Sequence, residues 1–236
     1  MTDDMTSAPS YREDVLTRGR LAGAIIAVTP QIVERVHEEF PGKTVVLLEE
    51  PIRPARTGQV VYPRTGDKPV IAWTGRQLRV QKILDIIYFS KRNHDFDFRV
   101  ITGKRRPHLE CPFEWEWSPF NRYNEAESFA GCVAGIANLE DTSYDACKGN
   151  YKVKTYMAMG LCPIVSNVGY ARNLIRNGET GLLVSSEREW LEAIEYAVTH
   201  PEQAVKMGKQ ARQYIFDNYD IEPLLHQWKE GFLRII

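Results

Sequence analysis

The sequence of 236 residues lacks several features that would indicate a function at once. It contains no apolar run approaching the ~20 residues that a membrane-spanning helix needs. Its net charge is −1, so no overall electrostatic field favours a nucleic acid or an anionic membrane as partner. Its first residues, MTDDMTSAPSYRED, have no basic stretch followed by an apolar one and do not resemble a secretory signal. We therefore expect no nucleic-acid partner and no transmembrane segment.

Cysteine is scarce and dispersed along the chain. The four cysteines are Cys111, Cys132, Cys147 and Cys162, and no two of them form a C-x-x-C pair. This spacing argues against a zinc ribbon. Scattered thiols in a chain of this size are typical of a reducing compartment, so we expect buried cysteines and a cytoplasmic location.

From residue 69 onward, short apolar runs alternate with helical patterns. The runs predict strands at 69–75, 97–103, 113–119, 132–137, 162–165 and a last one ending at 184, with helices at 81–92, 123–131, 152–159, from 171, 187–199, 202–218 and 222–236. Strands that alternate with helices indicate a parallel sheet covered on both faces. The predicted fold class is therefore α/β, a doubly wound, Rossmann-like parallel sheet over residues 69–236.

Residues 1–50 are predicted to be a separate piece of two helices and two strands, a partial β-α-β. Residues 51–68 contain three prolines and two glycines and are predicted to be a linker. Two strands and two helices are too few for an independent doubly wound core. We therefore expect residues 1–50 to be the end of another domain whose beginning is absent.

Cations and glycines follow the predicted strands at the edge where an open parallel sheet binds its ligands. They are Gly75, Arg76, Arg79, Lys82, Gly103, Lys104, Arg105, Arg106, Lys148, Gly149, Lys152 and Gly169, with Ser166 and Asn167 beside the last. For any single residue a solvated loop is an equally good interpretation. Together they favour a phosphate site, because glycines let the backbone approach a ligand while cations and helix-start N–H groups bind phosphate. Such an anion would also explain lysines at a helix start, where the helix dipole disfavours them.

Four stretches of the sequence resemble group 1 (family 4) glycosyltransferases of the GT-B fold. GLCPIVSNVGYARNLIRNGETGLLV (160–184) and GIANLEDTSYDACKGNYKVKTYMAMG (135–160) resemble the C-terminal half of these enzymes. IAWTGR (71–76) resembles the first strand and phosphate loop of the same domain. AIIAVTPQIVERVHEEFPGKTVVLLEEPI (24–52) is similar to the last β-α-β of their N-terminal domain. The resemblance thus covers nearly the whole chain.

This resemblance implies the transfer of a sugar from a nucleotide-diphosphate sugar to an acceptor, as in polysaccharide biosynthesis. It implies that the C-terminal domain binds the donor and that the N-terminal domain binds the acceptor. Members of the fold usually need no metal and no cofactor, because protein cations and helix-start N–H groups stabilise the leaving diphosphate.

The resemblance also assigns roles to individual residues. It implies that Arg76 and Lys152 are catalytic and that the donor-binding residues are Gly75, Lys148, Gly149, Asn150, Tyr151 and Thr155. The second lysine that the family has after its arginine has two candidates here. Lys82 lies about one residue out of register, and Arg79 is the alternative.

The sequence departs from the family at two carboxylates. The helix glutamate that usually holds the donor ribose is Thr155, and its partner about two turns earlier is Cys147. Thr155 retains a hydroxyl for the ribose, but without the charge assistance of a carboxylate. Two function classes therefore stay open, the donor-binding half of a glycosyltransferase and a non-catalytic nucleotide-sugar binding module or interaction protein descended from one.

Two further expectations concern other parts of the chain. The D-x-D pattern at Asp95–Asp97 lies where a strand enters the sheet, so we interpret it as a solvated strand start rather than a metal site. The closing helix has an apolar stripe of Leu224, Leu225, Trp228, Phe232 and Leu233, which we expect to pack against residues 1–50. An uncovered apolar face on that piece predicts self-association or a partner chain that supplies the missing domain.

Overall fold

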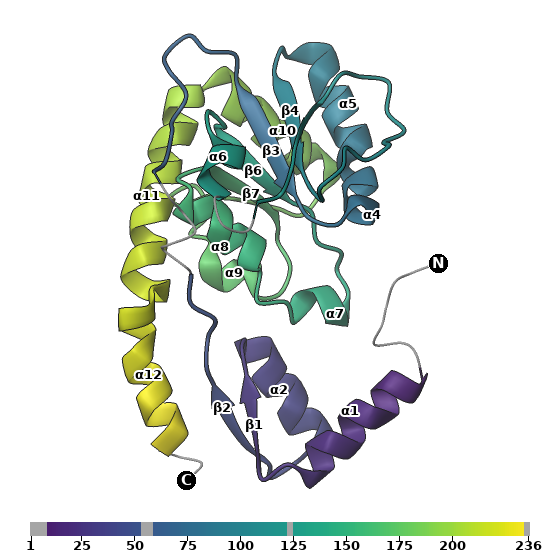
Figure 1. Ribbon diagram of the computed structural model, residues 1–236, viewed down its shortest axis with the longest axis vertical. Helices are drawn as coiled ribbons and strands as arrows, with labels where there is room; N and C mark the ends of the chain where they lie inside the picture. Colours follow the sequence, from purple (N-terminus) through teal and green to yellow (C-terminus); the bar gives the residue numbers. More distant parts are fainter. Residues whose placement is uncertain (1–8, 53–58, 122–124, 234–236) are drawn as a thin grey trace.

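The computed structural model describes residues 9–52, 59–121 and 125–233. Its larger part, residues 70–219, is called the main unit and contains a six-stranded, entirely parallel sheet in the order β5-β4-β3-β6-β7-β8 (Figure 1). The strands are β3 (Val70–Thr74), β4 (Asp97–Ile101), β5 (Glu116–Ser118), β6 (Ala134–Ala137), β7 (Cys162–Ser166) and β8 (Leu182–Val184). The predicted parallel sheet is confirmed.

Helices cover both faces of this sheet, and alternate residues of β3 show which helices pack on which face. Ile71 and Trp73 pack with α4 (Gln77–Val80), the 3-10 turn η1 (Gln81–Ile83), α5 (Leu84–Asn93) and α10 (Glu187–Thr199). Val70 and Ala72 pack with α6 (Glu125–Phe129), α8 (Tyr151–Ala158) and α11 (Pro201–Tyr219), and the short α7 (Ser143–Ala146) and α9 (Ala171–Leu174) complete the unit. Burial on both faces explains why the strands are continuous apolar runs, and it confirms the doubly wound α/β class.

The order of the strands determines where a ligand site can form. The chain builds outward from β3 through β4 to β5, and then returns to place β6 on the other side of β3. Loops that leave neighbouring strands in opposite directions open a crevice at the carboxyl ends of β3 and β6. This is the edge at which the sequence concentrates glycines and cations.

Residues 9–48 form a smaller part, called the N-terminal unit. It consists of α1 (Pro9–Leu21), β1 (Ala24–Ala27), α2 (Pro30–Glu39) and β2 (Thr44–Leu47). β1 and β2 pair in parallel, with Ile25 opposite Val45, as the sequence predicts. Of the predicted linker, residues 53–58 lie outside the described residues, and residues 59–68 contain neither helix nor strand.

The last two helices return the chain to the N-terminal unit. In Figure 1, α11 and α12 (Ile221–Leu233) follow one another along one side of the molecule, and α12 ends beside β2. The Trp228 indole Nε1 donates a hydrogen bond to the Glu49 carbonyl over 3.1 Å. Gly231 lies so close to β2 that a Cβ atom there would be 2.5 Å from Val46 Cγ1.

The predicted apolar stripe of α12 is only partly correct. Leu224 is buried and Trp228 is half-buried, but Leu225, Phe232 and Leu233 are exposed. The helix contacts β2 through its small residue, Gly231, because a glycine allows the two backbones to approach closely. Outside this narrow contact, the side chains of Leu225, Phe232 and Leu233 remain in solvent.

Three segments meet at a junction between the two units, around the buried side chain of Lys154. Only 1% of Lys154 is exposed, and its Nζ donates a hydrogen bond to the Glu50 carbonyl over 2.7 Å. The same Nζ lies 4.5 Å from the centroid of the Tyr219 ring at the end of α11. Tyr170, which precedes α9, donates a hydrogen bond to the Glu49 carboxylate. Burial lowers the pKa of Lys154 to about 8, against the opposing effect of the carboxylates of Glu49 and Glu50.

We predict that Gly208→Ala destabilises the protein. A Cβ atom on Gly208 of α11 would lie 2.1 Å from the carbonyl oxygen of Gly160, in the turn before β7, and backbone cannot easily yield. Helix propensity favours alanine by about 1 kcal/mol, but overpacking should outweigh it and leave a net loss of about 2 kcal/mol in the free energy of unfolding.

Urea unfolding measures this loss, and Gly23→Ala is the matched control. Gly23 has no heavy atom within 4 Å of a Cβ position, so its variant should unfold within about 0.5 kcal/mol of the wild type. Equal midpoints for the two variants would show that the contact between α11 and the turn is not tight.

Self-association stays a prediction, and the N-terminal unit gives it a physical basis. Among the described residues β1 pairs with β2 alone, and Ile26 on β1 is 49% exposed. An unpaired apolar edge promotes association between copies, and a charge on it opposes association. We expect concentration-dependent sedimentation at low micromolar protein, reduced in Ile26→Lys; a monomer at all concentrations would contradict it.

Candidate functional site: a cation cluster at the start of α8

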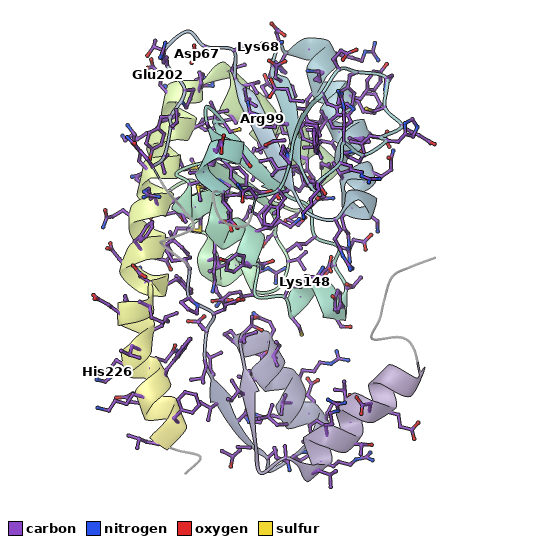
Figure 2. All side chains as sticks on the ribbon, viewed as in Figure 1. Asp67, Lys68, Arg99, Lys148, Glu202 and His226 are labelled. Atoms are coloured by element: carbon purple, nitrogen blue, oxygen red, sulfur yellow. The ribbon has the colours of Figure 1, made fainter. Side chains whose placement is uncertain are left out.

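The candidate site lies at the carboxyl ends of β3 and β6, where α8 begins. In Figure 2, Lys148 lies at the end of the main unit that faces the N-terminal unit, whereas Lys68 lies at the opposite end. Lys68 there binds Asp95 and Asp97 over 2.8 and 2.9 Å. The D-x-D pattern is therefore an ion-paired strand start, remote from the candidate site.

The start of α8 has the geometry of an anion site. Asn150 occupies the N-cap position with φ 50° and ψ 39°, and its side chain makes no capping hydrogen bond. The residue is 5% exposed, and its side-chain Nδ2 has no hydrogen-bond partner in the described part of the chain. A Cβ on the preceding Gly149 would lie 4.0 Å from Val28 Cγ2 of the N-terminal unit and 3.9 Å from Glu50 Oε2 in the segment after β2. An uncapped helix start with an unused amide donor suits a ligand rich in acceptors.

Lys152 projects from the first turn of α8 over an aromatic ring. Its Nζ lies 5.0 Å from the centroid of the Trp73 ring, and it makes no ion pair with any described residue. Burial, together with the positive charges of Lys148 and Arg79, lowers the pKa of Lys152 to about 8, against the opposing charge of Asp145. An anion bound beside this ammonium group would relieve both effects.

Asp145 organises the other two cations of the cluster. This buried carboxylate, in α7, accepts hydrogen bonds from Lys148, from Arg79 Nη1 over 3.2 Å and from the Glu140 amide over 2.9 Å. Burial alone would raise its pKa, but the hydrogen bonds from Lys148 and Glu140 and the charges of Lys148 and Arg79 lower the pKa of Asp145 below its usual value. It therefore remains ionised and holds Arg79 and Lys148 in place. Sequence reasoning missed Asp145, although its position three residues before Lys148 was a signal.

Trp73 connects the loops after β3 and β6. Its Nε1 donates to Asn138 Oδ1 over 2.8 Å, and Asn138 Nδ2 donates to the Arg79 carbonyl over 3.1 Å. A Cβ on Gly75 would lie 2.9 Å from Trp73 Cη2, and Gly75 has a φ of +154°, so only glycine suits this position. The next residue, Arg76, is exposed, and its guanidinium has no partner among the described residues.

The two candidates for the family's second cation, Arg79 and Lys82, lie in different surroundings. Arg79 shares Asp145 with Lys148 and lies close enough to Lys152 to lower the pKa of that lysine. Lys82 instead pairs with Glu140 and lines a separate cavity. Arg79, and not Lys82, therefore belongs to the cation cluster at the start of α8.

The remaining predicted residues flank the cluster. Tyr151 is the first residue of α8, and Thr155 is buried one turn further along the same helix. Cys147 lies against the N-terminal unit, because its carbonyl accepts a hydrogen bond from Thr29 Oγ1 over 3.2 Å. Burial raises the pKa of its thiol, and the charges that modify it belong to Arg35, Glu34 and Glu38 of α2.

Disulfides, metal-binding clusters and membrane-spanning helices would indicate other functions, and none occurs among the described residues. All four cysteines are free thiols. Within residues 9–52, 59–121 and 125–233, no group of three or more His, Cys, Asp and Glu side chains could hold a metal ion. No helix in this part of the chain combines the length and the apolar character that crossing a membrane requires.

Comparison with known proteins places this geometry in context. Residues 155–214 match the family model of glycosyl transferases group 1. A search of curated proteins found no match to the sequence.

Several solved structures share the fold at low sequence identity. Sucrose-phosphate synthase from Thermosynechococcus elongatus is 16% identical, with a TM-score of 0.71 over 94% of this chain and 62% of that one. TarM, a protein of S. aureus, is 11% identical, with a TM-score of 0.75 over 98% of this chain and 47% of that one. Anabaena HepE, solved with UDP and glucose, is 12% identical, with a TM-score of 0.71 over 94% of this chain and 66% of that one.

The chain therefore spans about half to two thirds of the length of these structures, and the matched part includes both units. The resemblance predicted from the sequence is confirmed: residues 155–214 match the group 1 glycosyl transferase model, and the chain has the Rossmann-like fold of the GT-B glycosyltransferases.

Proposed function

We propose that the chain is the donor-binding half of a glycosyltransferase, which transfers a sugar from a nucleotide-diphosphate sugar to an acceptor without a metal ion. The observation that carries this proposal is the cluster of Arg79, Lys148 and Lys152 around the uncapped start of α8, with Arg76 in the loop that follows β3 at the same edge of the sheet. The group 1 match and the UDP-bound fold relative HepE support a nucleotide-sugar as donor.

The cluster suits the charge that such a transfer develops. When an acceptor oxygen attacks the anomeric carbon of the sugar, the bond from that carbon to the phosphate oxygen breaks and the diphosphate leaves with an extra negative charge. Arg76 and Lys152 stabilise this charge, together with the N–H groups and dipole of α8. Arg79 and Lys148, oriented by Asp145, supply further positive charge, so the residues themselves perform the role of a metal ion.

The cellular setting is part of the same proposal. Free thiols support a reducing, cytoplasmic compartment, and the acceptor side would be completed by the N-terminal unit together with a further chain or a second copy. Group 1 membership supports a role in the synthesis of a polysaccharide or another glycan.

A non-catalytic nucleotide-sugar binding module is the alternative function. The observation that favours it is the absence of carboxylates at Thr155 and Cys147, which leaves the donor ribose and sugar without charge-assisted partners. Both functions require diphosphate binding. Only transfer or hydrolysis of a nucleotide-sugar in a panel assay would select the enzyme.

We predict that UDP or another nucleoside diphosphate binds equally well with and without EDTA, because the cluster neutralises the phosphates without a metal. Calorimetry measures the affinity. Lys152→Met should weaken it by about tenfold or more, whereas the exposed control Lys206→Met should not change it. A strict requirement for magnesium or manganese would contradict the proposal.

The affinity should also depend on pH in a way that identifies Lys152. The pKa of Lys152 in the unliganded protein is about 8, so the ammonium group is present below that value and lost above it. Affinity should therefore fall as pH rises from about 7.5 to 9.5, where the terminal phosphate is already fully ionised. Lys152→Arg keeps its charge and should show a flatter profile; parallel profiles would remove Lys152 from the site.

Lys152 should in addition reduce the stability of the unliganded protein. Its pKa is lowered from 10.5 to about 8, so the charged form is disfavoured in the folded state. Lys152→Met should raise the free energy of unfolding by about 2 kcal/mol below pH 8, and the gain should fade between pH 8 and 10.5. Urea unfolding below pH 8 and near pH 10.5 measures whether Lys152→Met raises the free energy of unfolding, with Lys206→Met as control.

A further inference from the structure

A separate cavity lies at the same edge of the sheet, beside the cation cluster. Its volume is about 520 Å³, and it is formed by the loops that follow β6, β7 and β8 together with side chains of η1, α5 and α10. We call it the β6–β8 cavity. Arg76, Lys148, Asn150 and Lys152 do not line it, so it is distinct from the proposed diphosphate site. Cavities of this size hold small organic ligands.

One wall of the cavity is apolar and aromatic. Ile83, Val168 and Val184 are buried in it, while Ile86 and Trp190 are half-buried and pack against the core. The indole N–H of Trp190 makes no hydrogen bond with the described residues. A partly exposed indole with an unused donor offers both a flat surface for C–H groups and a polar contact.

Carboxylates outnumber cations among the charged side chains that line the cavity. Lys82 pairs with Glu140, and Arg172 donates to the Asn167 side chain and carbonyl over 2.9 and 2.8 Å. Asp141 and Glu187 also line the cavity, and neither has a hydrogen bond or ion pair within the described part of the chain. The carboxylates of Glu140, Asp141 and Glu187 outnumber the cations of Lys82 and Arg172, so the lining has a net negative charge and does not suit an anion such as a phosphate.

These properties narrow the class of ligand. A purely apolar ligand would cover the two carboxylates without replacing their hydrogen bonds, which is costly. A sugar ring presents hydroxyl donors around its edge and apolar C–H groups on its faces. Carboxylates accept hydrogen bonds from such hydroxyls, and an indole packs against such a face. We propose that the β6–β8 cavity binds a neutral saccharide, held by Asp141 and Glu187 and stacked on Trp190.

The cavity adjoins the proposed transfer centre without overlapping it. Glu140 pairs with Lys82 in the cavity wall and lies 3.5 Å from Arg79 Nη1 in the cation cluster. A saccharide bound here would therefore lie next to the diphosphate site, while the binding itself does not depend on whether the chain transfers sugar.

Calorimetry with a panel of neutral disaccharides tests the proposal, namely maltose, cellobiose, lactose and diacetylchitobiose, each at up to about 10 mM. We expect at least one of them to bind in the presence of saturating UDP. Spermidine serves as a cationic probe of the same carboxylates. Failure of every disaccharide, competition with UDP, or tighter binding of spermidine than of any disaccharide would overturn the proposal.

Matched variants locate the binding. Asp141→Asn and Glu187→Gln preserve shape at exposed positions and should each weaken the disaccharide about fivefold to tenfold, because the acceptor loses its charge. Trp190→Ala should abolish binding, and Phe232→Ala, which removes an exposed aromatic ring on α12, should not affect it. UDP affinity should remain unchanged in all four. Unaltered disaccharide binding in both isosteric variants would refute the assignment, whatever Trp190→Ala does to folding.

Discussion

A buried ammonium group at the junction of the two units is the constraint on which the arrangement of the chain depends. The charge of Lys154 is removed from water, and the Glu50 carbonyl, the carboxylates of Glu49 and Glu50 and the faces of two tyrosine rings compensate for it. A buried charge is tolerated only when such partners are all in place. The segment after β2, the helix α8 and the end of α11 are consequently fixed relative to one another.

The same helix carries the candidate site. Lys152 and Lys154 are two residues apart on α8, so they project in different directions. Lys152 faces Trp73 and the cation cluster, while Lys154 faces the junction. Burial lowers both pKa values to about 8, but neighbouring cations add to the effect at Lys152, whereas carboxylates oppose it at Lys154. One helix thus presents an ammonium group that has no ion pair within the described part of the chain and another that already has its partners.

The sequence alone predicted the sheet and most helices because buried parallel strands are continuous apolar runs. The sequence also predicted that Arg76, Lys148 and Lys152 lie at the same edge of the sheet, because residues that follow parallel strands lie at the carboxyl ends of those strands. It did not reveal Asp145 or Trp73, because a carboxylate in a polar loop and an apolar ring in a strand are both ordinary. It gave no sign that Lys154 would be buried, because the segment that compensates its charge lies 104 residues away in sequence. The spacing of apolar residues predicted an apolar stripe on α12. Which of these residues are buried depends on the close contact between Gly231 and β2, which the spacing does not reveal.

The route of the chain between the two units has a mechanical consequence. The backbone passes between them after β2 and again between α11 and α12, and the Ile52 amide donates a hydrogen bond to the Tyr219 carbonyl over 2.8 Å where the two passages meet. Two connections that are tied at one point restrain sliding and separation of the two units more strongly than rotation about that point. Because Gly149 faces Val28 and Glu50 across the contact between the units, such a rotation would change the width of the opening at the start of α8. A small angular change at this point would therefore alter access to the cation cluster.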